Sequence, residues 1–227
     1  MVIKLGKTTD KICIGSKIEM IFDNVNEEKM NDPDKVYELV KKRYEEEKEM
    51  KWLKPLGFNN TFAITIKESK AEELGISSLT ELGPVSKDLI FASTQEFLER
   101  NDGYDHFKEV YNIEFKEIKA MDPGLCYTAV KGDQVDINVS FATDGRIPAF
   151  GLKVLTDDKN FFPTYFAAPI IRMDTLEKYP ELEELLNSLA GKLTDNEMAN
   201  LNAKVDIEKK DSKTVAKDWL KENGLIK

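Results

Sequence analysis

Histidine and cysteine are scarce in this chain, which has one histidine and two cysteines among its 227 residues. A structural zinc site takes four Cys or His ligands at close spacing, and the sequence offers no such cluster. A Ser–His or Cys–His catalytic pair would have to use His106, which lies in a charged stretch without a nucleophile motif nearby. The paired carboxylates Asp157 and Asp158 are more simply the polar residues of a turn. We therefore expect no metal ion, no cofactor and no enzymatic activity.

The two cysteines, Cys13 and Cys126, each lie in an apolar run. Free cysteine is among the most buried residue types, so two separate buried thiols are the simpler interpretation. A disulfide between them is the alternative, and no spacing pattern supports it.

Long hydrophobic runs are also absent. No run of about 18 apolar residues occurs, so we expect no membrane-spanning helix. The first ten residues, MVIKLGKTTD, lack the apolar core of a signal peptide. The mature part of an exported protein would look the same, so this absence does not indicate a cytoplasmic protein.

Basic charge is not in excess, because the formal net charge is −9. A nucleic-acid-binding protein needs a basic stripe to neutralise phosphates, so we expect no nucleic-acid partner. Hydrophobic residues make up 41% of the chain, which is enough for a folded core.

Short β-rich runs alternate with helical patterns along the chain, which predicts an α/β protein. Asp32 and Pro33 mark the start of a helix, Thr194 and Glu197 form a capping-box pattern, and Gly224 follows the last expected helix as a C-cap signal. The expected strands are 11–14, 18–22, 61–66, 88–92, 113–118, 135–141, 152–155 and 167–172; the expected helices are 33–50, 70–74, 79–82, 95–100, a helix resuming after 103 up to 111, 125–130, 175–189, 194–204 and 212–223.

Four segments combine aromatic side chains with tight turns: 58–62 (FNNTF), 96–100 (EFLER), 141–145 (FATDG) and 161–165 (FFPTY). Aromatic faces attract cations, and a desolvated cage of rings suits a quaternary ammonium group. Arginine forms a planar fork for a carboxylate, so rings and an arginine together would suit a betaine. The alternative is that these rings are core residues, which spacing alone favours because burial is the usual fate of aromatics beside strands.

The order of seven motifs carries a resemblance. These motifs are GSK, WLKPLGFNNTFA, EFLERNDGY, MDPGLCYTAV, VDINVSFATDGRI, LKVLTDDKNFFPTYFAAPIIR and MANLNAKVD. Together they resemble the substrate-binding proteins of osmoprotectant ABC importers, namely the glycine betaine, carnitine, choline and proline betaine binders of the ProX/OpuC type. The resemblance covers nearly everything from residue 32 to the C-terminus.

The resemblance implies a periplasmic-binding-protein fold, with two α/β lobes that close around a ligand cleft. Residues 56–146 would form the inner lobe, and residues 1–55 with 147–227 would form the outer lobe. The ligand would be a quaternary ammonium osmolyte, the protein partner would be an ABC permease subunit, and the location would be extracytoplasmic.

The resemblance also implies the residues of the ligand site. Phe62 and Phe141 stand at aromatic cage positions, and Tyr165 matches the cage tyrosine of the FPxY motif. Within FFPTYF, Tyr165 is expected to face the cleft, and Phe161, Phe162 and Phe166 are expected to pack. The remaining predicted contacts are Arg100, which would bind a ligand carboxylate, with Glu96, Asn60 and Lys17.

The chain departs from the family pattern after Lys17. Family members continue with a helix, a strand and a second helix before an EYTGT-like motif that supplies another cage tyrosine. Here IEMIFD follows at once, and Asn24 stands where that tyrosine is expected. The resemblance therefore implies a shortened outer lobe. It leaves a second functional interpretation open: a truncated domain with weak or no osmolyte binding, which self-associates or pairs with another chain through exposed apolar faces.

Overall fold

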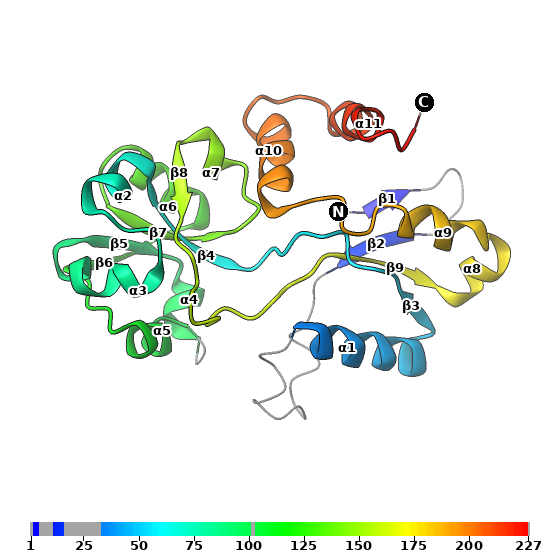
Figure 1. The fold of residues 1–227 in the computed structure, drawn as a ribbon, viewed down its shortest axis with the longest axis horizontal. Coiled ribbons are helices and arrows are strands. Elements are labelled where there is room, and N and C mark those ends of the chain that lie inside the picture. Colours follow the sequence, from blue (N-terminus) through cyan, green and yellow to red (C-terminus); the bar gives the residue numbers. More distant parts are fainter. Residues whose placement is uncertain (1, 5–10, 16–32, 101–102, 227) are drawn as a thin grey trace. The chain divides into compact units, whose positions relative to one another are not determined.

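The computed structural model describes residues 2–4, 11–15, 33–100 and 103–226 (Figure 1). Lys17, Asn24 and the expected strand 18–22 lie outside these residues. By its internal contacts the chain divides into two compact units. The first unit comprises the described residues of 1–60 with 163–197, and the second comprises 61–162 with 198–226.

The second unit is built on a five-stranded sheet with the order β6-β5-β7-β4-β8 (Figure 1). Strand β7 pairs antiparallel with β4 and parallel with β5, and β4 pairs antiparallel with β8 on its other side. The strands are β4 (Phe62–Lys67), β5 (Ile90–Ser93), β6 (Glu117–Ala120), β7 (Ile137–Phe141) and β8 (Leu152–Val154).

Side chains alternate between the two faces of this sheet, as the pleat requires. Ile64 and Val139 belong to the larger hydrophobic cluster on one face. The other face carries buried polar residues, and α6 packs on it against β4, β5 and β7. The helices of this unit are α2 (Glu68–Leu74), α3 (Leu79–Leu82), the 3-10 helix η3 (Gly83–Asp88), α4 (Gln95–Glu99), α5 (Tyr104–Tyr111), α6 (Pro123–Lys131), α7 (Arg146–Ala149) and α11 (Ser212–Glu222).

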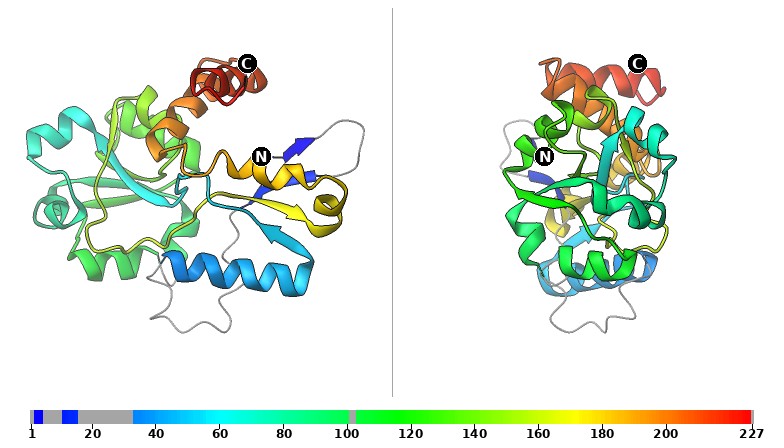
Figure 2. Two further views of the ribbon diagram at one scale, coloured as in Figure 1. Left: turned by 45° about the vertical axis from the view of Figure 1, so that its right-hand side comes forward. Right: turned by 90° about the vertical axis from the view of Figure 1, so that its left-hand side faces the viewer.

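The first unit has a four-stranded antiparallel sheet with the order β1-β2-β9-β3. Helix α1 packs against β3 (Figure 2), where Val40 and Trp52 are buried together with Ala168 of β9. Its elements are β1 (Val2–Lys4), β2 (Lys11–Gly15), α1 (Pro33–Lys48), β3 (Met50–Trp52), β9 (Ala168–Arg172), α8 (Met173–Lys178) and α9 (Glu181–Asn187). Helix α10 (Asp195–Asp206) begins in this unit and continues into the second.

The α/β fold class predicted from the sequence is confirmed, and so are several local signals. Thr194 and Glu197 form the expected capping box: Thr194 N donates to the Glu197 carboxylate at 2.8 Å, and Glu197 N donates to Thr194 Oγ1 at 3.2 Å. The hydrogen bond from Thr194 N, and after it the one that Thr194 Oγ1 donates at 2.8 Å, lower the pKa of the Glu197 carboxyl. Gly224 follows α11 with φ +67°. Cys126 is a buried free thiol.

Other expectations were wrong at particular residues. The strand expected at 113–118 begins only at Glu117, where β6 starts. Ile113 and Phe115 alternate as in a strand because both side chains are buried in the core, but they lie in a loop without strand pairing. The expected strand 88–92 starts only at β5, after η3. The expected helix 175–189 divides at Tyr179 and Pro180, where proline opens α9. The first helix, expected to end at about residue 50, ends at Lys48, and Met50 already begins β3.

The two units divide the chain differently from the expected lobes 56–146 and 1–55 with 147–227. Strand β8 explains part of the difference, because its pairing with β4 places residues 152–154 in the sheet of the second unit. Residues 198–226 also belong to the second unit. That the units act as two lobes closing on a ligand stays a prediction. None of the helices in the described part of the chain is long and apolar enough to cross a membrane.

Candidate functional site

Two of the predicted site residues, Phe62 and Phe141, lie directly opposite each other on β4 and β7. Their rings stack, with centroids 5.0 Å apart and an interplanar angle of 26°. Phe62 opens β4 and Phe141 closes β7, so both rings lie at one end of the sheet. The Phe141 side chain is 38% exposed, which leaves aromatic surface open to a ligand.

Phe62 is backed by an aromatic cluster. Its ring centroid is 5.5 Å from that of Phe97 and 6.3 Å from that of Phe162. Both of these neighbours are buried, so the Phe62 ring packs against the hydrophobic core. Phe162 and the partly buried Phe161 belong to the core cluster, which confirms that these two residues are packing residues.

Arg100 lies on the same face. Its guanidinium carbon is 5.9 Å from the centroid of the Phe62 ring, and Nη1 lies 3.6 Å from Glu96 Oε1. The local chain is ordered by Thr94, which caps α4 by accepting a hydrogen bond from Phe97 N. The structure therefore brings together four predicted site residues, Phe62, Glu96, Arg100 and Phe141, within the second unit.

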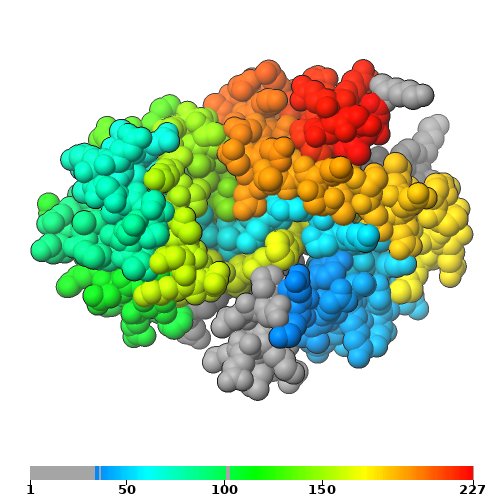
Figure 3. Space-filling model, viewed as in Figure 1, coloured from blue at the N-terminus to red at the C-terminus, as the bar shows by residue number. Residues whose placement is uncertain are grey.

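The turn after Phe141 is fixed by α10, which contains the predicted MANLNAKVD motif. Asn202 Nδ2 donates a hydrogen bond to the carbonyl oxygen of Thr143 at 2.8 Å. A Cβ on Gly145 would lie 2.7 Å from the Cα of Ala203, so only glycine allows the helix this close. In the space-filling view, orange residues of α10 border the yellow-green residues around α7 (Figure 3).

Asn60 and Tyr165, predicted as ligand contacts, are brought together in the first unit. Asn60 N donates to the Tyr165 carbonyl oxygen at 3.1 Å, and Tyr165 N donates to Asn59 Oδ1 at 2.6 Å. Asn59 N in turn donates to Asp195 Oδ1 at 2.6 Å. Both predicted residues are half-buried. Lys17, the remaining predicted contact, lies outside the described residues.

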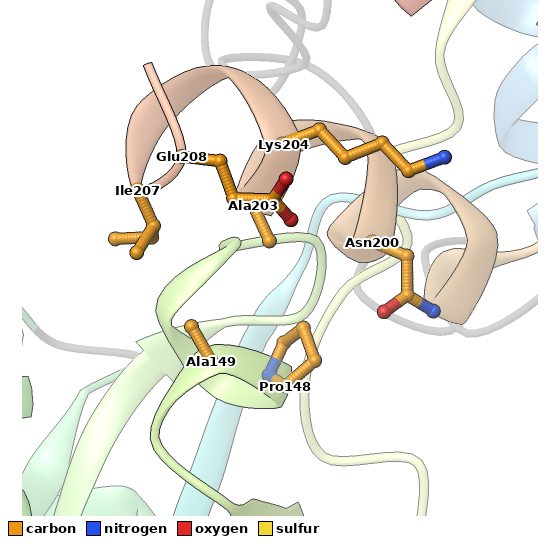
Figure 4. Close-up of a pocket in the computed structure, with 7 residues that line it drawn as sticks. All are labelled: Pro148, Ala149, Asn200, Ala203, Lys204, Ile207 and Glu208. Carbon is orange, nitrogen blue, oxygen red and sulfur yellow. The ribbon is translucent and has the colours of Figure 1, made fainter. Parts of the chain in front are cut away.

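A surface pocket elsewhere in the second unit lies between α7 and α10 (Figure 4). Pro148 and Ala149 form one side, and the α10 segment forms the other, with Asn200, Ala203 and Lys204 among its residues. None of the predicted site residues lines it. Its lining contains no aromatic ring, so it lacks the groups that would hold a quaternary ammonium ion.

Tyr127 is a residue that the sequence did not single out as part of this site. It is buried in α6, and its hydroxyl accepts a hydrogen bond from the backbone N–H of Phe141 at 3.0 Å. Burial raises the pKa of its phenol. The guanidinium carbon of Arg146 lies 4.5 Å from the Tyr127 ring centroid, and Arg146 Nε donates to Asp144 Oδ1 at 3.0 Å. In the sequence, Tyr127 belongs to an expected helix and to the motif MDPGLCYTAV of the family resemblance, and neither indicated a contact with Phe141.

Comparison with known proteins places the chain in a family. Residues 13–222 match the model of the OpuAC substrate-binding domain of ABC-type glycine betaine transport systems. The chain is 38% identical over 203 residues to the carnitine transport binding protein OpuCC of Listeria monocytogenes, covering 89% of this chain and 66% of that protein. It is 39% identical over 196 residues to a glycine-betaine-binding protein of Pseudomonas aeruginosa, covering 82% of this chain and 63% of that protein.

Solved structures of binding proteins also resemble this chain. A crystal structure described as a glycine betaine/carnitine/choline ABC transporter aligns with a TM-score of 0.82 at 33% identity, covering 86% of this chain and 72% of the other. Ligand-free YehZ from Escherichia coli aligns with a TM-score of 0.79 at 28% identity, covering 92% and 78%. The chain belongs to the family of OpuAC-type substrate-binding domains of ABC transport systems, which are binding proteins and not enzymes.

Proposed function

We propose that this chain binds a quaternary ammonium osmolyte, such as glycine betaine, carnitine or choline, and delivers it to the permease of an ABC importer. The observation that carries the proposal is the exposed ring of Phe141, stacked on Phe62 and on the same face as Arg100. Relatives of this family are named for binding carnitine and glycine betaine, which supports the same ligand class.

The chemistry of this face matches the two ends of a betaine. A trimethylammonium group has no N–H to donate, so its recognition depends on the negative faces of aromatic rings. Phe141 offers such a face, and Phe62 supports it from behind. Arg100 offers a guanidinium group for the carboxylate. Glu96 lies within ion-pair distance of Arg100, and we propose that it orients the guanidinium.

Asn60, Tyr165 and Lys17 are proposed as further ligand contacts, on the strength of their motifs. Tyr165 would supply another aromatic ring, and Asn60 and Lys17 would supply polar contacts. The extracytoplasmic location and the permease partner are proposed on the same family grounds. Both are proposals because the chain spans about two thirds of the length of the relatives that it matches.

Isothermal titration calorimetry tests the proposal directly. The purified chain is titrated with glycine betaine, carnitine and choline, with glycine as the control ligand because it has the same carboxylate without the methyl groups. We expect heat and saturation with at least one of the three osmolytes and none with glycine. No heat at millimolar concentration of any osmolyte would contradict the proposal. Light scattering of the same sample then tests the alternative of a self-associating domain without osmolyte binding.

A further inference from the structure

The backbone N–H of Phe141 has an unusual position in the sheet. Phe62 and Phe141 form a pair that shares no backbone hydrogen bond, because the neighbouring Ala142 N donates to the Thr61 carbonyl oxygen at 2.9 Å. The N–H of Phe141 therefore points away from β4. On that side lies β5, whose pairing with β7 reaches only Asn138. Strand pairing thus ends before Phe141 on this side.

The hydroxyl of Tyr127 takes the place of the missing strand. It accepts the hydrogen bond from Phe141 N at 3.0 Å, and the tyrosine side chain is 1% exposed. A partly buried N–H that loses its acceptor costs free energy, so this bond holds the end of β7 in place. Because Phe141 also carries the exposed ring, a hydrogen bond that fixes its backbone N–H also fixes the position of the Cα and Cβ from which the ring extends.

A buried polar network supports the same strand end from the adjacent residues. Thr65 Oγ1 donates to Asn138 Oδ1 at 2.8 Å and lies 2.6 Å from Ser140 Oγ. Asn138 Nδ2 donates to Ser140 Oγ at 2.9 Å. All three side chains are buried polar groups on the face that α6 covers. The network therefore ties β4 to β7 on the sheet face opposite the two stacked rings.

We propose that Tyr127 is a positioning residue for ligand binding, whose hydroxyl fixes the end of β7 so that the Phe141 ring stays stacked on Phe62. This inference rests on the proposed function, because the ring is positioned for the osmolyte. Tyr127 itself touches no ligand. Without its hydroxyl, the Phe141 ring samples more orientations, and ordering it upon binding weakens affinity.

The test compares two matched variants, Tyr127→Phe and Tyr111→Phe. Tyr111 is also a buried tyrosine of the second unit, and its hydroxyl also accepts a backbone N–H, from Lys159 at 2.9 Å. Each substitution removes one hydroxyl and keeps the ring. By calorimetry with glycine betaine, we expect Tyr127→Phe to raise the dissociation constant about three- to tenfold, and Tyr111→Phe to leave it within about twofold. A purely structural role would lower the melting temperature of both without this difference in affinity.

Hydrogen exchange adds a readout that needs no ligand. The Phe141 amide of the wild-type protein should be protected like the interior amides of β7, and Tyr127→Phe should remove that protection selectively. A Phe141 amide that exchanges as fast as a free strand end in the wild type would overturn the inference. Wild-type binding with equal affinities in both variants would overturn it as well. Failure of the wild type to bind any osmolyte would instead contradict the proposed function.

Discussion

Phe62 and Phe141 are cross-strand partners whose rings stack at 5.0 Å, although 78 residues separate them in the sequence. The pair shares no backbone hydrogen bond, the arrangement that brings side chains of opposite residues closest together. The rings differ in exposure: Phe62 packs against Phe97 and Phe162, while Phe141 is 38% exposed. The Phe62 ring thus supports the Phe141 ring, and the Phe141 ring is the one exposed to solvent.

Truncation of the exposed ring should therefore weaken binding more than it weakens folding. A desolvated cation–π contact contributes about 2 kcal/mol, so Phe141→Ala is expected to lower affinity for glycine betaine by tenfold or more, on the order of that energy. Tyr179→Ala is the matched control, since Tyr179 is an aromatic residue of similar exposure, 42%, in the first unit. Calorimetry gives affinities and thermal unfolding gives stabilities. Equal affinities of the two variants would exclude Phe141 from the site.

Removal of the guanidinium fork should change ligand preference. Arg100→Lys keeps the positive charge but loses the planar pair of donors that matches a carboxylate. We expect affinity for glycine betaine and carnitine to fall about tenfold, while affinity for choline, which has a hydroxyl instead of a carboxylate, changes little. Competition titrations with the three ligands measure this. A uniform loss for all three would mean that Arg100 does not bind the carboxylate.

Asp157 fastens the segment that carries Phe162. Its carboxylate accepts hydrogen bonds from Phe161 N at 2.9 Å, from Phe162 N at 2.8 Å and from the Tyr111 hydroxyl. Asp157→Ala removes the carboxylate that accepts all three hydrogen bonds, so we expect a loss of about 2–3 kcal/mol in the free energy of unfolding. The neighbouring Asp158 is exposed and accepts from Thr80 N at 3.1 Å, so Asp158→Ala should cost clearly less. Urea unfolding of both variants checks the order.

Buried tyrosines should make the fold sensitive to high pH. Burial raises the pKa of Tyr37 to about 12, and burial also raises those of Tyr111 and Tyr127. A raised pKa means that the folded state prefers the neutral phenol. The stabilisation is therefore complete below pH 10, the value of an unfolded tyrosine, and is lost as the pH rises through the folded values.

Between pH 9 and pH 11 the contribution of Tyr37 should fall by roughly 1.4 kcal/mol, because one pKa unit corresponds to that energy. Urea unfolding at both pH values measures the fall for the whole protein. The same pair of experiments on Tyr37→Phe should show a smaller fall. An identical fall in the variant would mean that Tyr37 titrates normally.

Local signals in the sequence predicted local structure well. The capping box of Thr194 and Glu197, the turn before Gly145 and the strand that opens with Phe62 all depend on neighbouring residues. Of the rings that gather around Phe62, the motif resemblance indicated Phe141 as a cage residue and Phe162 as a packing residue, and it gave Phe97 no role. Spacing along the chain does not reveal which rings meet. Their meeting depends on the register of β4 with β7.

The features that escaped prediction depend on contacts far apart in the sequence. Ile113 and Phe115 look like a strand by alternation but are buried in a loop. Tyr127 looks like a helix core residue, and only the end of β5 pairing explains why its hydroxyl meets Phe141 N. The pattern of residues in one segment does not show which residue of a distant segment will contact it.

The most direct measurement is a crystal structure of this protein grown with glycine betaine. The account predicts ligand density with the trimethylammonium group within about 6 Å of the Phe141 ring centroid and the carboxylate paired with Arg100. Density in the pocket between α7 and α10, or a ligand that leaves Phe141 and Arg100 untouched, would contradict it.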